Sequence, residues 1–119
     1  MYTLKIHKNL DSQKWATFPI DRQIFMIANE LQRLLTCIKN GMSLSTQKER
    51  IECAFELVDL TISVQNGHFR YELLRWRELF AALYLLDEAN LKKSYPLIAL
   101  LLKTLLQLSP KTNSLALSQ

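Results

Sequence analysis

Turn-forming residues are scarce in this sequence. Two glycines and three prolines occur among its 119 residues. β-Sandwiches and β-barrels need a turn between every pair of short strands, so this scarcity argues against both and favours a few long helices. The length is that of a single domain with one hydrophobic core.

Cysteine and histidine are equally rare, which removes support for most catalytic or metal chemistry. Cys37 and Cys53 are too few for a disulfide scaffold and lack the spacing of metal ligands. Both fall within apolar helical patterns, which predicts reduced packing residues in a cytoplasmic protein. His7 and His68 are far apart in the sequence, and no zinc motif or glycine-rich phosphate loop is present. We therefore predict a protein that is not an enzyme and needs no cofactor.

No stretch of the sequence is apolar enough to predict a membrane segment or a secretion signal. The longest apolar run, PLIALLLKTLLQL, has thirteen residues with a lysine among them, whereas a membrane-spanning helix needs about 20. The first fifteen residues, MYTLKIHKNLDSQKW, contain no continuous apolar core. These features predict a cytoplasmic protein that does not contact a membrane.

Apolar residues recur at steps of three and four, the period of amphipathic helices. Four helices are expected, over residues 19–40, 46–65, 68–86 and 94–108. The second begins with Thr46 in a T-x-x-E capping box, and an Asn-Gly pair ends the first and the second helix. Pro96 favours a start of the fourth helix near Tyr95, or a kink, over a continuous helix from Asn90.

These patterns predict an all-α fold, with an antiparallel four-helix bundle over residues 17–108. Residues 1–16 alternate in part like a strand, but a lone strand would have no partner in a helical chain. An N-terminal arm or a short helix is therefore expected there. Residues 109–119 are expected to form a flexible C-terminal tail.

The fourth helix is the most apolar, since only Lys103, Thr104 and Gln107 interrupt it between residues 97 and 108. Such a helix either lies centrally in its own bundle or is covered by a second subunit. The apolar circumference of this helix exceeds what packing inside a four-helix monomer needs to cover. We therefore predict a homo-oligomer in which a second subunit covers the remainder. The residues expected at its interface are Leu97, Leu101, Leu102 and Leu105.

The stretch RYELLRWRELF, residues 70–80, combines arginines with aromatic residues. It is either a polyanion-binding surface or part of the seam between helices. The hairpin between the second and third helices would bring Asp59 level with Arg75, and Glu56 level with Arg77. We therefore predict structural ion pairs among these four residues, which orient helices more reliably than they stabilise them.

A nucleic-acid partner is the alternative. The net charge is +4, and the positive charges gather near the two ends of the chain. This charge permits nucleic-acid binding without requiring it, because many proteins of similar charge bind none. The residues that would contact the nucleic acid are Lys5, Lys8, Lys14, Arg70, Arg77, Lys92 and Lys93.

Three runs of residues carry a resemblance to known proteins. They are FMIANELQR at 25–33, AFELVDLTI at 54–62 and ELLRWREL at 72–79, preceded by Lys14 and Trp15. Over residues 14–86 the chain resembles a group of small uncharacterised bacterial helical proteins, which implies a fold but no reaction. The polar positions that it would share with them are Glu30, Arg33, Glu56, Asp59, Thr61, Arg75, Arg77 and Glu78.

In size and helix count the chain is similar, more loosely, to the four-helix-bundle accessory proteins of diversity-generating retroelements and to ribosomal-RNA intervening-sequence proteins. The retroelement family implies a pentameric ring that binds a reverse transcriptase and nucleic acid through basic surfaces. This sequence differs because its positive charge is confined to the ends. We therefore predict a non-enzymatic oligomeric adaptor that mediates protein–protein contacts, with a nucleic-acid-binding accessory protein as the alternative.

Overall fold

The computed structural model describes residue 7 and residues 10–117, with side chains as far as residue 113. Within these residues the chain is helical and contains no strand, which confirms the all-α class. The helices are α1 (Ser12–Ala16), α2 (Ile20–Lys39), α3 (Leu44–Val64), α4 (Gly67–Ala81), α5 (Glu88–Lys93), α6 (Tyr95–Leu106) and α7 (Pro110–Leu117), with a short 3₁₀ helix, η1 (Ala82–Leu85), after α4.

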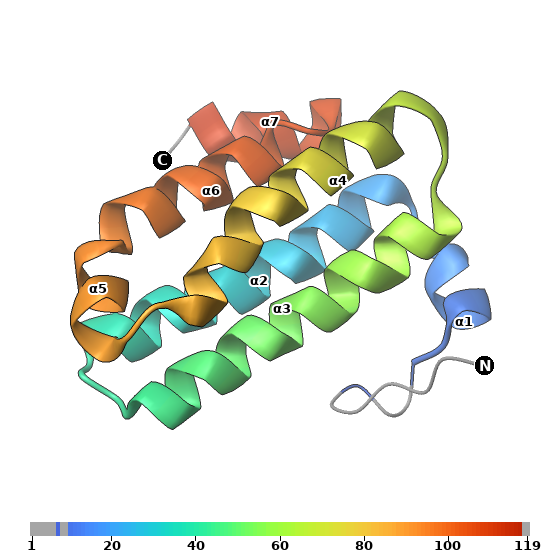
Figure 1. The fold of residues 1–119 in the computed structure, drawn as a ribbon. Coiled ribbons are helices and arrows are strands. Elements are labelled where there is room, and N and C mark those ends of the chain that lie inside the picture. Colours follow the sequence, from blue (N-terminus) through green and yellow to red (C-terminus); the bar gives the residue numbers. More distant parts are fainter. Residues whose placement is uncertain (1–6, 8–9, 118–119) are drawn as a thin grey trace.

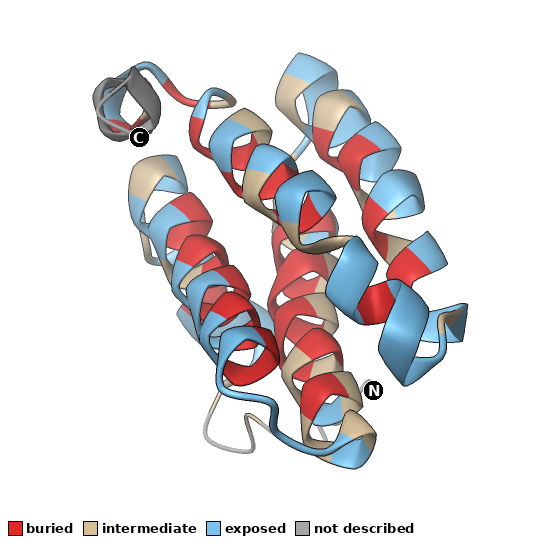
Figure 2. Ribbon diagram, turned by 90° about the vertical axis from the view of Figure 1, so that its left-hand side faces the viewer, coloured by how far each residue is buried: buried red, intermediate tan, exposed pale blue. Residues whose placement is uncertain are grey.

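The four longest helices lie side by side (Figure 1). Helix α2 packs against α3 and α6, and α4 packs against the same two helices. Buried residues occupy the faces that these helices turn toward one another (Figure 2). The short helices α1 and α5 lie at opposite ends of the molecule (Figure 1).

Two glycines make the sharp turns on either side of α3. Gly41 and Gly67 have φ angles of 67° and 66°, a left-handed conformation that glycine adopts without a steric penalty. Helix α3 begins earlier than the predicted capping box at Thr46. Ser43 is its N-cap, because the Ser43 hydroxyl accepts the backbone N–H of Thr46 at 3.2 Å and so satisfies a free donor of the first turn.

The helix predicted over residues 94–108 is α6, with Pro96 in its first turn. A separate helix, α5, precedes it and is capped by Asp87, whose carboxylate accepts the backbone N–H of Asn90 at 2.8 Å. The two helices meet at Ser94. They are not continuous, because a proline inside a helix lacks the N–H for the ladder and its ring collides with the preceding turn.

The C-terminal segment, predicted to be a flexible tail, contains helix α7. Ser109 and Thr112 are buried, and the Thr112 hydroxyl donates to the carbonyl of Leu106 at 2.5 Å. Helix α7 packs against α6 and α2. The apolar pattern gave no sign of this contact because polar groups contribute to it.

Helix α6 is enclosed by its own chain, against α2, α4 and α7. The side chains of Leu101, Leu102 and Leu105 are 3%, 3% and 0% exposed. The prediction that these three leucines form an oligomer interface is therefore wrong, because they already lie in the core of one molecule. The fourth predicted interface residue, Leu97, is 48% exposed.

Candidate functional site

One ion pair joins α3 to α4. The Nε of Arg77 donates to Oδ1 of Asp59 at 2.7 Å, and the Arg77 guanidinium lies 5.1 Å from the centre of the Phe55 ring. Arg70, seven residues earlier on the same flank of α4, donates through its Nε to the carbonyl of Ile62 at 3.1 Å. Both arginines therefore contribute to the contact between α3 and α4.

This pairing differs from the one expected from the positions of the residues along the α3–α4 hairpin, which placed Asp59 level with Arg75. Asp59 meets Arg77 and not Arg75, because residues two apart on a helix point in directions about 200° apart. The two arginines therefore cannot both face α3. The Arg75 guanidinium lies instead 5.9 Å from the centre of the Tyr71 ring. The predicted pairing of Asp59 with Arg75 is wrong for this reason.

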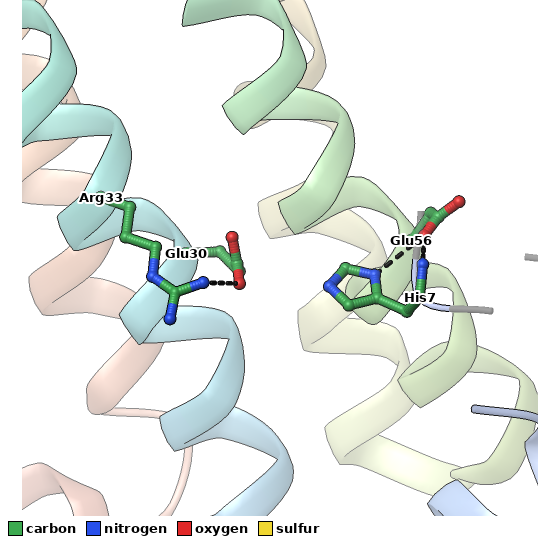
Figure 3. A network of polar contacts seen from close by, with 4 residues as sticks. All are labelled: His7, Glu30, Arg33 and Glu56. Atoms are coloured by element: carbon green, nitrogen blue, oxygen red, sulfur yellow. Dashed lines mark hydrogen bonds and ion pairs between the residues drawn. The ribbon is translucent and has the colours of Figure 1, made fainter. Parts of the chain in front are cut away.

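Glu56, predicted to meet Arg77, contacts His7. Its Oε2 accepts the backbone N–H of His7 at 2.9 Å and lies 2.8 Å from Nδ1 of the same histidine (Figure 3). The Glu56 side chain is buried, so this double contact takes place largely out of water. It fastens His7 onto α3.

Trp15 docks α1 onto α3. Its side chain is fully buried, and its Nε1 donates to the Thr61 hydroxyl at 2.9 Å. Its ring meets Phe18 edge-on, with ring centres 5.5 Å apart, and Gln23 donates to its carbonyl at 3.0 Å. Residue spacing did not identify Trp15 as a core residue, because a five-residue helix is too short to show an apolar period.

A groove opens between α2 and the first half of α3. Its volume is about 620 Å³. The residues that line it are Asn29, Gln32, Arg33, Thr36 and Cys37 from α2, and Met42, Thr46 and Arg50 from α3 and the loop before it. The apolar spacing along the chain gave no indication of this groove. The one signal that could have indicated it is an arginine on each helix at similar distances from the turn at Gly41.

A buried carboxylate lies beside this groove. Glu30 of α2 is 6% exposed, and its Oε1 accepts a hydrogen bond from Nη1 of Arg33 at 3.0 Å (Figure 3). The other carboxylate oxygen is buried, and no residue in the described part of the chain hydrogen-bonds to it. Glu30 therefore sets the direction of the Arg33 guanidinium, which is itself mostly exposed.

Both cysteines are buried and free, as expected for packing residues. Burial raises the pKa of the Cys53 thiol, and the nearby positive charge of Arg50 offsets part of that effect. A raised pKa lowers the fraction of thiolate, the reactive form, at any given pH. The environment of Cys53 therefore suits packing better than nucleophilic chemistry.

We expect the Cys53 thiol to react slowly with a thiol reagent in the folded protein. In a Cys37→Ser variant at pH 8, the reaction should be roughly 100-fold slower than in urea, the factor for a local opening that costs about 3 kcal/mol. The Cys53→Ser variant provides the comparison for Cys37, which borders the groove. Equal rates for Cys53 in folded and unfolded protein would contradict its burial.

The described lysines of the predicted nucleic-acid-binding set do not all lie together. Lys14 is exposed on α1, whereas Lys92 and Lys93 are exposed on α5 at the opposite end of the molecule (Figure 1). Lys5 and Lys8 lie outside the described residues. The two arginines of the predicted set contact α3, as described above. The described members therefore do not form one continuous basic surface.

Three exposed leucines lie on the neighbouring helices α4 and α6. Leu79 is 64% exposed, and Leu97 and Leu100 are 48% and 54% exposed. The Nε1 of Trp76 donates to the carbonyl of Leu101 at 2.9 Å, so these two residues are level on their helices. Leu79 follows Trp76 by three residues, whereas Leu97 and Leu100 precede Leu101, and the two helices run in opposite directions (Figure 1). These three residues are therefore at similar heights along α4 and α6, and we call this set of exposed leucines the leucine face.

No protein-family model matches the chain, and no curated protein or solved structure matches it either. The resemblances to small bacterial helical proteins and to retroelement accessory proteins stay predictions. Among the residues that the structure describes, no group of three histidine, cysteine, aspartate or glutamate side chains could hold a metal ion. None of the described helices combines the length and the apolar character needed to span a membrane.

Proposed function

We propose that this protein is a non-enzymatic four-helix-bundle adaptor that associates with further copies of itself and mediates protein–protein contacts. The bundle would consist of α2, α3, α4 and α6, and the packing of these helices on one another supports this assignment. The observation that carries the proposal is the leucine face, which exposes three large apolar side chains on the adjacent helices α4 and α6.

A second copy of the chain is the occupant that suits this face best. Burying a leucine side chain contributes roughly 1.5–3 kcal/mol, whereas association costs about 4–15 kcal/mol in lost freedom of motion. In a dimer with twofold symmetry the same face occurs twice, so six leucines would be buried. Because each of these leucines is already about half buried, their combined contribution is roughly 5–9 kcal/mol, which lies within the range of that cost.

Light scattering over a dilution series tests this proposal. We expect the wild-type chain to be a dimer or larger at about 100 μM and to dissociate on dilution. The double variant Leu97→Glu, Leu100→Glu should be monomeric throughout, because an interface would bury unpaired carboxylates. Phe25→Glu is the matched control, since Phe25 is 46% exposed on a different helix. Its mass should equal that of the wild type.

Two outcomes would contradict the proposal. One is a wild-type chain that stays monomeric at about 100 μM, which would mean that the leucine face forms no stable self-contact. The other is a double variant whose mass at every concentration equals that of the wild type. In that case the chain self-associates through another surface.

The nucleic-acid-binding accessory protein has less support. Binding along a nucleic-acid backbone requires cations that follow one continuous path. Lys14 and Lys92 lie on helices at opposite ends of the molecule, and Arg77 is engaged by Asp59. We therefore favour the adaptor. We also propose that the protein is cytoplasmic, which the two free cysteines support.

A further inference from the structure

Arg50 is a partly buried cation with little to neutralise it. Its side chain is 26% exposed, and its nearest carboxylate, on the largely exposed Glu49, is 3.8 Å away. No residue in the described part of the chain hydrogen-bonds to its guanidinium. A cation that loses water without gaining hydrogen-bond partners is costly to bury. The N–H groups of the Arg50 guanidinium are therefore available to donate hydrogen bonds to a ligand.

Arg33 lines the same groove from the facing helix. Glu30 accepts from one of its N–H groups, at 3.0 Å, and the remaining N–H groups stay available on a side chain that is 63% exposed. Glu30 itself is buried and does not line the groove. It therefore acts as a positioning residue that holds the Arg33 guanidinium in place.

The groove has the size of a small-molecule site, and its lining is mostly polar. Its volume of about 620 Å³ falls within the roughly 300–1,000 Å³ typical of ligand pockets. Guanidinium groups match the paired oxygens of carboxylates and phosphates through two parallel hydrogen bonds. Apart from the two arginines, the lining is uncharged: Asn29, Gln32, Thr36 and Thr46 supply polar groups, and Cys37 and Met42 supply an apolar end.

We propose that the groove between α2 and α3 binds a small organic anion through Arg33 and Arg50, with a carboxylate or phosphate as the recognised group. The two guanidiniums hold the anionic group, while the amide and hydroxyl side chains contact the polar remainder of the molecule. The apolar end receives a hydrophobic part. This site is separate from the leucine face, which lies on α4 and α6, so each can be tested alone.

An NMR titration of the full chain with inorganic phosphate, phenyl phosphate and succinate, each used separately, tests the site. We expect at least one probe to shift the side-chain Nε–H signals of Arg33 and Arg50 to saturation, with half-saturation below about 1 mM. A response to phenyl phosphate but not to succinate would identify phosphate as the recognised group, and the reverse would identify carboxylate.

Substitutions at Arg50 separate recognition from general charge. Arg50→Gln should weaken binding by about tenfold, because it removes a charge-assisted pair. Arg50→Lys should weaken it less, since it keeps the charge but loses the planar fork. Arg75→Gln is the matched control, because it removes the same charge from α4, and it should change the affinity by less than about twofold.

The proposal is overturned if the shifts stay linear with all three probes, or if Arg75→Gln weakens binding as much as Arg50→Gln. Circular dichroism shows whether the Arg50 variants fold. If they do not, Arg33→Gln takes their place, because the Arg33 side chain is mostly exposed. It too should weaken binding by about tenfold, and an unchanged affinity would again overturn the proposal.

Discussion

Replacing Trp15 with alanine is expected to lower the free energy of unfolding by about 3–5 kcal/mol, the usual cost of removing a buried tryptophan side chain. The Trp15 side chain is fully buried, its ring contacts Phe18, and its indole N–H donates to the Thr61 hydroxyl. The substitution removes all three interactions at once. It leaves a cavity between α1 and α3 that a five-residue helix cannot refill.

Urea unfolding followed by circular dichroism and by fluorescence measures this loss. In the variant, Trp76 is the remaining tryptophan, and because it lies between α4 and α6 its fluorescence reports on the core. Trp15→Phe serves as the comparison. It keeps most of the apolar volume and removes the indole N–H, so it should cost about 1–2 kcal/mol. A loss below about 1 kcal/mol for the alanine variant would contradict the docking of α1 as part of the cooperative fold.

The long helices could be predicted because burial requires a fixed spacing of apolar residues. A helix with one face in the core must place apolar side chains every three or four residues. Trp76 and Phe80 obey this rule, and their rings stack in the core with centres 5.1 Å apart. The same rule predicted that the helices would be long, since few glycines or prolines interrupt the pattern.

The contacts between helices could not be predicted in the same way. Spacing shows which face of a helix is apolar, but it does not show how far a helix is rotated against each neighbour. Asp59 therefore meets Arg77 and not Arg75, and Glu56 meets His7, a residue 49 positions away in the sequence. The contact of α7 with α6 was missed because a threonine hydroxyl helps to form it.

The groove between α2 and α3 illustrates the same limit. Arg33 and Arg50 are 17 residues apart and each looks like an ordinary surface arginine in its own helix. They become a candidate site because the turn at Gly41 folds α3 back along α2. That no described residue hydrogen-bonds to the Arg50 guanidinium is a property of the packed structure, and no local sequence pattern indicates it.

The apolar character of α6 was predicted, but a second subunit was expected to cover Leu101, Leu102 and Leu105, which instead lie in the core of one molecule. Replacing Leu105 with alanine should cost about 3–5 kcal/mol in free energy of unfolding, because Leu105 is 0% exposed within a single chain. The substitution removes packing inside a single molecule, so the change in unfolding free energy should be the same at every protein concentration.

Leu100→Ala on the same helix is the matched control. Leu100 is 54% exposed and belongs to the leucine face. Its substitution should therefore lower the free energy of unfolding only in an oligomer, and this loss should vanish on dilution to the monomer. Urea unfolding at about 1 μM and about 100 μM separates the two cases. If the effect of Leu105→Ala also vanished on dilution, Leu105 would be an interface residue, because only a contact between molecules depends on concentration.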